Sequence, residues 1–210
     1  MINLAVITGD LVGSTVAQHS GAYHRQLDTL LKDIAARYKA RFQTYRGDGF
    51  QVVIAPGNAL EACLLLRAGL IAASPHKQER WDARLAIAFG SENAPAAEFN
   101  GEFSGASFIL SGRTLDAMET ETLRMVAQSL VLQTTLDLAA AFLDNIVSHW
   151  TVAEAASIFE YLKGRENHQI IADRLGKQRP TVTLALKRAH YNLIDRCIND
   201  TRLLLELIGD

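Results

Sequence analysis

The chain has 210 residues, 49% of them hydrophobic, which is enough to bury one large core or two modest ones in a soluble globular protein. Its 21 basic and 23 acidic residues give a net charge of −2, which argues against a protein that is basic throughout. The N-terminal segment lacks the basic region of a signal peptide, and no stretch of membrane-spanning length is free of charges, so we expect a cytoplasmic protein with no contact with a membrane. The two cysteines lie far apart, so we expect them to be reduced thiols.

The first half of the chain alternates strand-like and helix-like segments. In chain order we predict a buried strand over Leu4–Thr8, a helix over 21–40, a hairpin of two strands over 41–46 and 50–54, a helix over 58–73 and a strand over 83–89. The order β-α-β-β-α-β is the ferredoxin-like pattern, an antiparallel sheet with helices packed on one face. The first and third strands are central neighbours in such a sheet.

The second half reads as helical. We expect a surface loop over 91–105, a helix over 106–118, helical periodicity across Leu123–Val147 and a capped helix over 152–162. The fold class is therefore α+β. The predicted units are a sheet domain over 1–119, a connecting helix or helices over 120–149, and an all-α domain over 150–210 whose apolar C-terminal helix packs on the connecting helix or on a second copy.

Residues 167–191 have the pattern of a helix-turn-helix. Ile171, Ala172 and Leu175 form one apolar face, Gly176 permits a sharp turn, and a second apolar stripe begins at Val182. Polar and basic side chains that can bond base edges and phosphates are left on the outer face or beside it. The candidate DNA-binding residues are Lys177, Gln178, Arg179, Thr181, Thr183, Lys187 and Arg188.

The charge of the chain is concentrated around this motif. Residues 161–196 hold eight basic and three acidic side chains, a net charge of +5, so the remainder of the chain carries −7. A local basic footprint is what DNA phosphates require. The alternative is an ordinary helical hairpin with a solvated, charged face.

Two aspartates in predicted turns are candidate metal ligands. Asp10 follows the first strand and Asp48 lies at the tip of the hairpin, so both are expected at the same end of neighbouring strands, where two carboxylates could share one Mg²⁺. The intervening loop offers donors to a polyphosphate, and a nearby arginine can reach a phosphate or pair with a carboxylate. These candidate ligand-binding residues are Gly13, Ser14, Thr15 and Arg46. The alternative is that both aspartates only shape turns.

The N-terminal motifs resemble those of class III nucleotide cyclases. The segment from Ile7 to Thr15 is similar to their first metal-binding segment, Tyr45–Phe50 to their second, and Gly105–Arg113 to the segment with their transition-state Asn and Arg. The resemblance implies that Asp10 and Asp48 hold Mg²⁺ or Mn²⁺ with a nucleotide and that Arg113 is the counterpart of the catalytic arginine. Ile109 stands in place of the asparagine, and the usual purine-selecting lysine is missing, so we assign no catalytic residue and expect binding without turnover.

The chain as a whole resembles the SatD family of transcriptional regulators. The motifs are Gly9-Asp10-Leu11-Val12-Gly13-Ser14, Gly47-Asp48-Gly49-Phe50-Gln51, Trp150-Thr151 and Ile171-Ala172-Asp173-Arg174-Leu175-Gly176. The resemblance implies a DNA-binding regulator with a small-molecule effector, for which we expect a nucleotide. Because a helix-turn-helix monomer makes few contacts with DNA, we also expect a homodimer.

Other functions remain open beside this one. The chain is alternatively an active nucleotidyl cyclase that uses the two aspartates, or its sheet domain is an inert dimerisation scaffold. The six histidines show no paired metal-ligand spacing with cysteine, so the sequence predicts no zinc site.

Overall fold

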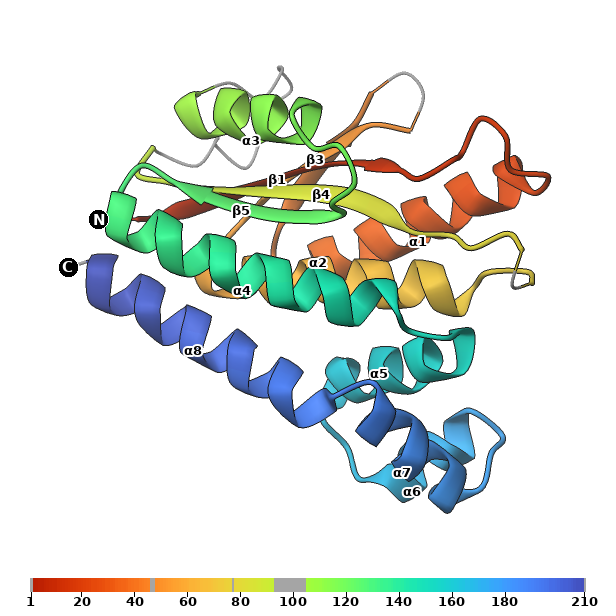
Figure 1. The fold of residues 1–210 in the computed structure, drawn as a ribbon. Helices are drawn as coiled ribbons and strands as arrows, with labels where there is room; N and C mark the ends of the chain where they lie inside the picture. The colour runs from red at the N-terminus through yellow and green to blue at the C-terminus, as the bar shows by residue number, and fades with distance from the viewer. Residues whose placement is uncertain (1, 46–47, 77, 93–104, 210) are drawn as a thin grey trace.

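The computed structural model describes residues 2–45, 48–76, 78–92 and 105–209. The strands are β1 (Leu4–Leu11), β2 (Arg41–Thr44), β3 (Phe50–Ile54), β4 (Ala83–Gly90) and β5 (Leu123–Ala127). The helices are α1 (Ser20–Tyr38), α2 (Pro56–Ala72), α3 (Ala106–Asp116), α4 (Leu130–Ser148), α5 (Val152–Gly164), α6 (His168–Arg174), α7 (Arg179–Arg188) and α8 (Tyr191–Gly209). Figure 1 shows a sheet with helices on both faces and a helical lobe, α5 to α7, at one end.

The five strands form one sheet in the order β2-β3-β1-β4-β5. The first four are antiparallel, and β1 lies between β3 and β4, which confirms the predicted neighbours. Because β1 is central and covered on both faces, its apolar run is buried, as a continuous hydrophobic strand requires. The register places Gly9 opposite Phe50 and Asp10 opposite Arg84, so the end of β1 lies beside the start of β3.

The helices cover both faces of the sheet, and the two that belong to the predicted β-α-β-β-α-β unit share one face, as expected. Helices α1 and α2 pack on one face, and α3 covers the other, where Phe108 packs with Leu4, Val6 and Val53. The apolar side chains of β1 point alternately to the two faces, so a sheet with a long apolar central strand needs a cover on each side.

Residues 123–127 form β5 and not the start of a helix, which corrects the predicted connecting helix. The strand pairs with β4 in parallel, after a crossover through α3. Leu123 and Val126 are three residues apart, as on one face of a helix, but Leu123 and Met125 are two residues apart, as on one face of a strand. The available edge of β4 decides between these two patterns, and the helix begins only at Leu130.

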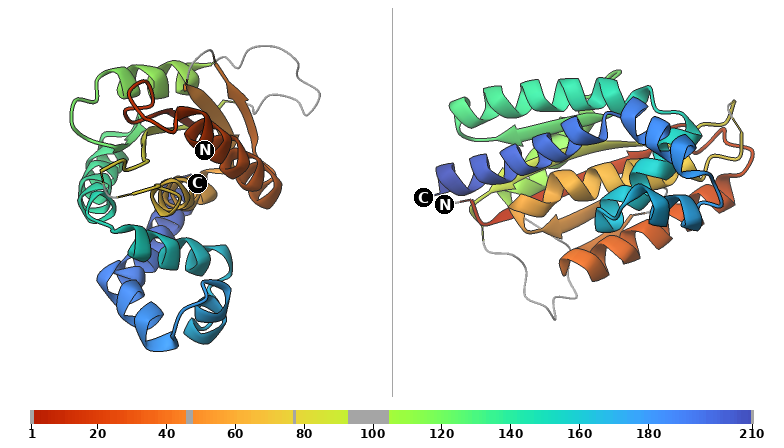
Figure 2. Two further views of the ribbon diagram at one scale, coloured as in Figure 1. Left: turned by 90° about the vertical axis from the view of Figure 1, so that its right-hand side faces the viewer. Right: turned by 90° about the horizontal axis from the view of Figure 1, so that it is seen from below.

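The largest hydrophobic cluster extends from one face of the sheet into the helical lobe. Helix α2 is buried from Ala59 to Ile71, because it packs against the sheet and α1 on one side and against α5 and α8 on the other. The view from below in Figure 2 shows α8 running alongside α2 and α4. Cys63, within α2, is a buried free thiol, and Cys197 on α8 is also free, as expected from the sequence.

Helix α4 is the one described helix that is long and apolar enough to cross a membrane by length and composition. It nevertheless carries Asp137 and Asp144, and its buried side includes Leu132, Leu136 and Leu143, which belong to the protein core. Asp144 forms an ion pair with Arg67 inside the structure. These contacts are those of a core-covering helix.

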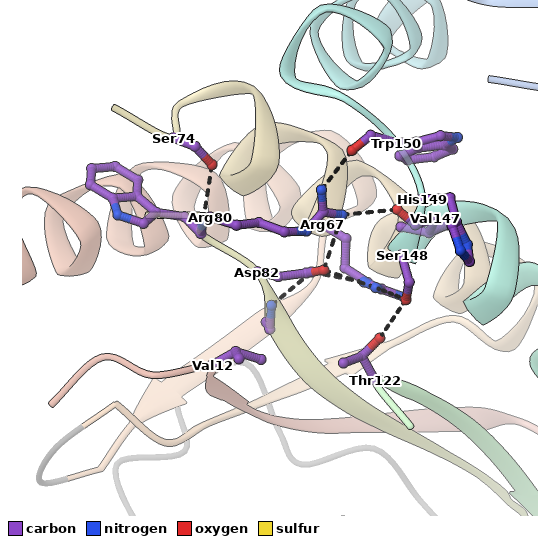
Figure 3. A network of polar contacts seen from close by, with 12 residues as sticks. Val12, Arg67, Ser74, Arg80, Asp82, Thr122, Val147, Ser148, His149 and Trp150 are labelled. Atoms are coloured by element: carbon purple, nitrogen blue, oxygen red, sulfur yellow. Dashed lines mark hydrogen bonds and ion pairs between the residues drawn. The ribbon is translucent and has the colours of Figure 1, made fainter. Parts of the chain in front are cut away.

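A buried polar network joins the sheet to α4 (Figure 3). Arg67 of α2 is 0% exposed, donates to both carboxylate oxygens of Asp82 at 2.8 and 2.9 Å, and donates to Asp144 at 2.8 Å. Burial alone lowers the pKa of Arg67, but the two carboxylates reverse that effect and raise it, so the guanidinium stays charged. Thr122, just before β5, donates from its backbone to Asp144 at 2.8 Å and extends the network to the edge of the sheet.

Arg80 connects the same network to the helical lobe. Its guanidinium lies 3.6 Å from Asp82 and donates to the carbonyls of Val147 at 3.0 Å and Trp150 at 2.6 Å, where α4 ends (Figure 3). The indole of Trp150 in turn donates to the carbonyl of Ala189, at the end of α7, at 3.2 Å. One chain of polar contacts, through Arg80 and Trp150, thus joins the end of α7 to the segment just before β4.

Candidate nucleic-acid interface and ligand loop

The helical lobe is built from well-capped short helices. At the start of α5, the side chain of Thr151 accepts from the backbone of Glu154 and the Glu154 side chain accepts from the backbone of Thr151, which confirms the predicted capping box. The Asn167 side chain accepts from the backbone of Gln169 and Ile170 and starts α6 in the same way. Such caps define where each helix begins, because the first backbone N–H groups have no helical partner.

The turn between α6 and α7 has the hydrogen bonds of a Schellman motif. Lys177 N–H donates to the carbonyl of Ala172 at 2.9 Å, and Gly176 N–H donates to that of Asp173 at 3.2 Å. Gly176 adopts φ of +60°, a left-handed conformation that favours glycine. The sharp turn predicted at Gly176 is confirmed, and it sets the angle between the two helices.

Helix α7 is held by a narrow apolar stripe and leaves the remainder of its surface to solvent. Val182 and Leu186 are fully buried, as is Ala189 just after the helix. The seven residues predicted to contact DNA are all exposed: Lys177, Gln178, Arg179, Thr181, Thr183, Lys187 and Arg188. Thr183 is also bonded to His168 of α6, with 2.9 Å between Oγ1 and Nδ1. The structure thus brings the predicted set together on one exposed helix and the turn before it.

Half of the basic charge counted around this motif is neutralised by ion pairs. Lys163 pairs with Glu160 at 2.8 Å, Arg165 with Glu61 at 2.8 Å, Arg174 with Glu166, and Arg196 with Asp200 at 3.4 Å. The other four cations form no ion pair with any described residue: Lys177, Arg179, Lys187 and Arg188. The unpaired charge is therefore concentrated on α7 and its turn, a sharper footprint than the sequence count gives.

Asp10 is held by an arginine that the sequence reasoning missed. Arg84 Nε donates to Asp10 Oδ1 at 2.9 Å, and Nη2 contacts Oδ2, which is a bidentate ion pair across β1 and β4. The hydrogen bond to Asp10 raises the pKa of Arg84, although partial burial opposes it, and Asp48 and Asp116 add to the rise through their charges. The strand register Asp10 opposite Arg84 is the signal that would have found this partner.

Gly9 makes this arrangement possible. A Cβ at this position would lie 2.6 Å from the Phe50 ring and 2.8 Å from the carbonyl oxygen of Arg84. Only glycine lets the three strands approach this closely at the end of β1, so the Gly-Asp pair has a packing role in addition to any turn-forming role.

The loop after β1 is tied to the β2–β3 hairpin through Asp48. The Ser14 hydroxyl donates to Asp48 Oδ2, and Ser14 is 4% exposed, so its side chain faces the protein and not the solvent. Gly13, with φ of +65°, and Thr15 are exposed. Arg46, predicted to contact a phosphate, lies outside the described residues.

The carboxylates of Asp10 and Asp48 are not free to share one Mg²⁺. Both oxygens of Asp10 are engaged by Arg84, and one oxygen of Asp48 is engaged by Ser14. A cation at this position would have to displace the Arg84 guanidinium, which already neutralises Asp10. No reaction step through a metal follows from this geometry.

The predicted counterpart of a catalytic arginine lies on α3. Arg113 and Ile109 are both exposed and share one face of the helix, four residues apart. Asp116 of the same helix lies close enough to influence Arg84 electrostatically. The C-terminal end of α3 therefore lies near the Asp10–Arg84 pair, and Arg84 also donates to the carbonyl of Met118 at 3.3 Å, but no hydrogen bond or ion pair among the described residues joins Arg113 to Asp10 or Asp48.

Comparison with known proteins gives structural likeness only. The sequence matches no protein-family model and no curated protein sequence. The solved structures that superpose on part of the chain include three nucleotide cyclases. A bacterial light-regulated adenylyl cyclase has 10% identity, covers 59% of this chain and 75% of its own, and gives a TM-score of 0.46. The adenylyl cyclase CyaB from P. aeruginosa has 16% identity, covers 60% of this chain and 76% of its own, and gives a TM-score of 0.44. The guanylyl cyclase domain of RhoGC from the aquatic fungus Blastocladiella emersonii has 17% identity, covers 57% of this chain and 76% of its own, and gives a TM-score of 0.43.

Proposed function

We propose that this protein is a DNA-binding transcriptional regulator of the SatD type that reads double-stranded DNA with α7. The observation that carries the proposal is the exposed outer face of α7, which is held on its inner side by Val182 and Leu186 and follows the tight turn at Gly176. Helix-turn-helix proteins insert the second helix of such a pair into the major groove, with its N-terminal residues at the base edges. Gln178, Arg179 and Thr183 occupy that end of α7.

The charge distribution supports the same interpretation. Lys187 and Arg188 lie in the last turn of α7, where they can contact phosphates on either side of a groove, and neither is neutralised by a described residue. Arginine and glutamine near the helix start have the donor geometry for guanine and adenine edges. The proposal therefore assigns base reading to the start of α7 and phosphate contacts to its end.

The test is binding to a random-sequence duplex library, followed by selection and by salt titration of the selected fragment. We expect the double variant Arg179→Ala with Lys187→Ala to bind about 10-fold or more weakly and to lower the salt slope by about 1 for each phosphate that it no longer neutralises. The matched control removes two exposed cations from α1, Arg25→Ala with Lys32→Ala, and should bind as wild type does. If the α7 double variant binds all duplexes like wild type, the assignment of α7 is wrong.

A homodimer is part of the proposal, and its interface is assigned to α4 and α8. Phe142 is 66% and Leu138 is 61% exposed on α4, and both line an apolar groove of about 500 Å³ that Leu193 of α8 also lines. Arg196 and Asp200 lie at the same groove. Arg196 and Asp200, which pair with each other at 3.4 Å on one helix, could exchange partners across a two-fold axis, which favours a second copy of the chain as the occupant.

Sedimentation of the wild type and of Phe142→Asp tests this interface. We expect the wild type to sediment as a dimer and the variant as a monomer with weaker DNA binding, because a buried charge at an apolar interface has no partner. Val16→Asp is the control, since Val16 is an exposed apolar residue in the loop after β1. A monomeric wild type would contradict the proposed dimer.

The proposed effector is a nucleotide with Mg²⁺ or Mn²⁺ near the loop after β1. Exposed Gly13 and Thr15, with Asp48 at their side, support this assignment, and binding requires Arg84 to release Asp10. We expect ATP or GTP with Mn²⁺ to raise the melting temperature of the wild type but not that of Asp48→Asn. The absence of a shift in wild type would favour an inert scaffold, whereas a cyclic product that Asp48→Ala abolishes would favour an active cyclase.

A further inference from the structure

Three metal-ligating side chains meet on the described surface at a place that the proposed function does not use. His19 precedes α1, and His76 and Glu79 lie in the segment between α2 and β4. Their ligand atoms all lie within 4.8 Å of one another. His19 and His76 are far apart in the sequence, which explains why no spacing rule found the cluster.

We propose that His19, His76 and Glu79 form a binding site for a divalent transition-metal ion of the Zn²⁺ class. Two imidazoles and one carboxylate are a common three-residue ligand set for zinc, with a fourth position left to water or another ligand. Imidazole nitrogen binds Zn²⁺, Co²⁺ and Ni²⁺ and is a poor ligand for Mg²⁺ or Ca²⁺. The site is thus distinct in position and in metal class from the carboxylates at Asp10 and Asp48.

Two of the three distances within the cluster are close to what one ion requires. Ligand bonds of about 2.0–2.1 Å in tetrahedral geometry place neighbouring ligand atoms about 3.3 Å apart. His19 Nδ1 lies 2.9 Å and His76 Nε2 lies 3.7 Å from Glu79 Oε2, values on either side of that separation. His19 Nδ1 and Glu79 Oε2 lie within hydrogen-bond distance, and a bound cation would take the place of that hydrogen bond.

The carboxylate is oriented by groups that leave one of its oxygens to the ion. Glu79 Oε1 accepts from the backbone N–H of His19 at 3.0 Å and from the indole N–H of Trp81 at 3.2 Å, so Oε2 faces the two imidazoles. An ionised, oriented carboxylate is the form that binds a metal.

The residues that support the cluster are themselves held by buried contacts. Trp81 is buried and stacks on Tyr23 with 4.9 Å between ring centroids, and its backbone N–H donates to Ser74 at 2.9 Å. Glu79 N–H donates to the carbonyl of His76 at 3.1 Å, which closes the turn that carries both ligands. A chance meeting of surface side chains would not have this second layer of buried support, which holds the ligands in place before an ion binds.

The experiment is a Co²⁺ titration of untagged, chelator-treated full-length protein, followed by the visible d–d absorption of the bound ion. We expect one Co²⁺ per chain with tetrahedral bands and displacement by equimolar Zn²⁺ but not by excess Mg²⁺. His19→Ala, His76→Ala and Glu79→Gln should each weaken binding by about 10-fold or more, and Trp81→Phe, which keeps the stacked ring, by about 10-fold.

His24→Ala is the matched control, because His24 lies on α1 but hydrogen-bonds Ser20 instead of the cluster. His19 and His76 are about half exposed, so their variants should keep the wild-type melting temperature without metal. Wild type without visible bands, or bands that persist in both histidine variants, would overturn the proposal. Neither result depends on DNA, so the site and the regulator proposal can fail separately.

Discussion

The charged side chains around the sheet and those on α7 with its turn differ in whether they have partners. In the sheet, charged groups partner each other: Arg84 neutralises Asp10, and Arg67 bridges Asp82 and Asp144 in the interior. On α7 and its turn the basic side chains are exposed and form no ion pair with a described residue. Paired charges hold elements together, whereas unpaired cations on a rigid helix are available to a polyanion. The contrast separates structural charges from those proposed to bind DNA.

The largest expected effect comes from removing the centre of the buried network. Arg67→Met leaves Asp82 and Asp144 without their cation, and the loss of one partner of a buried pair costs about 3–5 kcal/mol in the free energy of unfolding. Urea denaturation measures this loss. Arg25→Met, on the exposed face of α1, should stay within about 0.5 kcal/mol of wild type. If Arg67→Met lowered the free energy of unfolding by less than about 0.5 kcal/mol, the network would not stabilise the protein.

A smaller effect is expected at the turn that orients α7. Gly176→Ala forces a Cβ into a left-handed conformation and should cost about 1–2 kcal/mol. Gly112→Ala is the control with the opposite sign, because a Cβ there meets nothing within 4 Å and alanine favours the interior of α3 by up to about 1 kcal/mol. Thermal melts of the two variants should shift in opposite directions, and equal shifts would refute the assigned role of the turn.

The Asp10–Arg84 pair should contribute less than the buried network. Its two side chains are 23% and 34% exposed, and partly solvated pairs are worth about 0.2–1 kcal/mol. Arg84→Met therefore lowers stability slightly while freeing Asp10 for a cation. Mn²⁺-nucleotide should raise the melting temperature of this variant more than that of wild type, and an unchanged response would show that Asp10 takes no part in ligand binding.

The smallest effect is expected on α7 itself. Arg179→Gln and Lys187→Gln should each change the free energy of unfolding by no more than about 0.5 kcal/mol, because neither side chain has a described ion-pair partner. Chemical denaturation checks this, with Arg165→Gln as the comparison, since Arg165 bridges Glu61 and Asp195. If either α7 variant lowered the free energy of unfolding by clearly more than about 0.5 kcal/mol, the cations of α7 would be structural charges like those around the sheet.

Periodicity predicts most of the elements because their side chains alternate or repeat cleanly. The strand at Leu4, the hairpin, and the two helices around Gly176 follow from local pattern and turn chemistry. The strand β5 does not, because a short parallel edge strand is specified by the neighbour it joins and not by its own five residues.

The site residues divide in the same way. The outward residues of α7 follow from helical spacing, and the neighbouring ends of β1 and β3 follow from topology. Arg84 depends on strand register, and the meeting of His19 with His76 depends on two loops coming together, which no local pattern contains. The net charge of +5 around α7 can be counted in the sequence. The structure adds that half of the basic side chains there form ion pairs, which leaves the other half available to bind a polyanion.

The positions of the two tryptophans give the protein two built-in optical probes. The chain contains only Trp81 and Trp150, and their indole N–H groups donate to Glu79 in the histidine cluster and to Ala189 at the end of α7. Trp150→Phe leaves only the emission of Trp81, beside the histidine cluster, and Trp81→Phe leaves only that of Trp150, beside the helical lobe. The fluorescence of each single-tryptophan variant can therefore report on one region of the protein without an added dye.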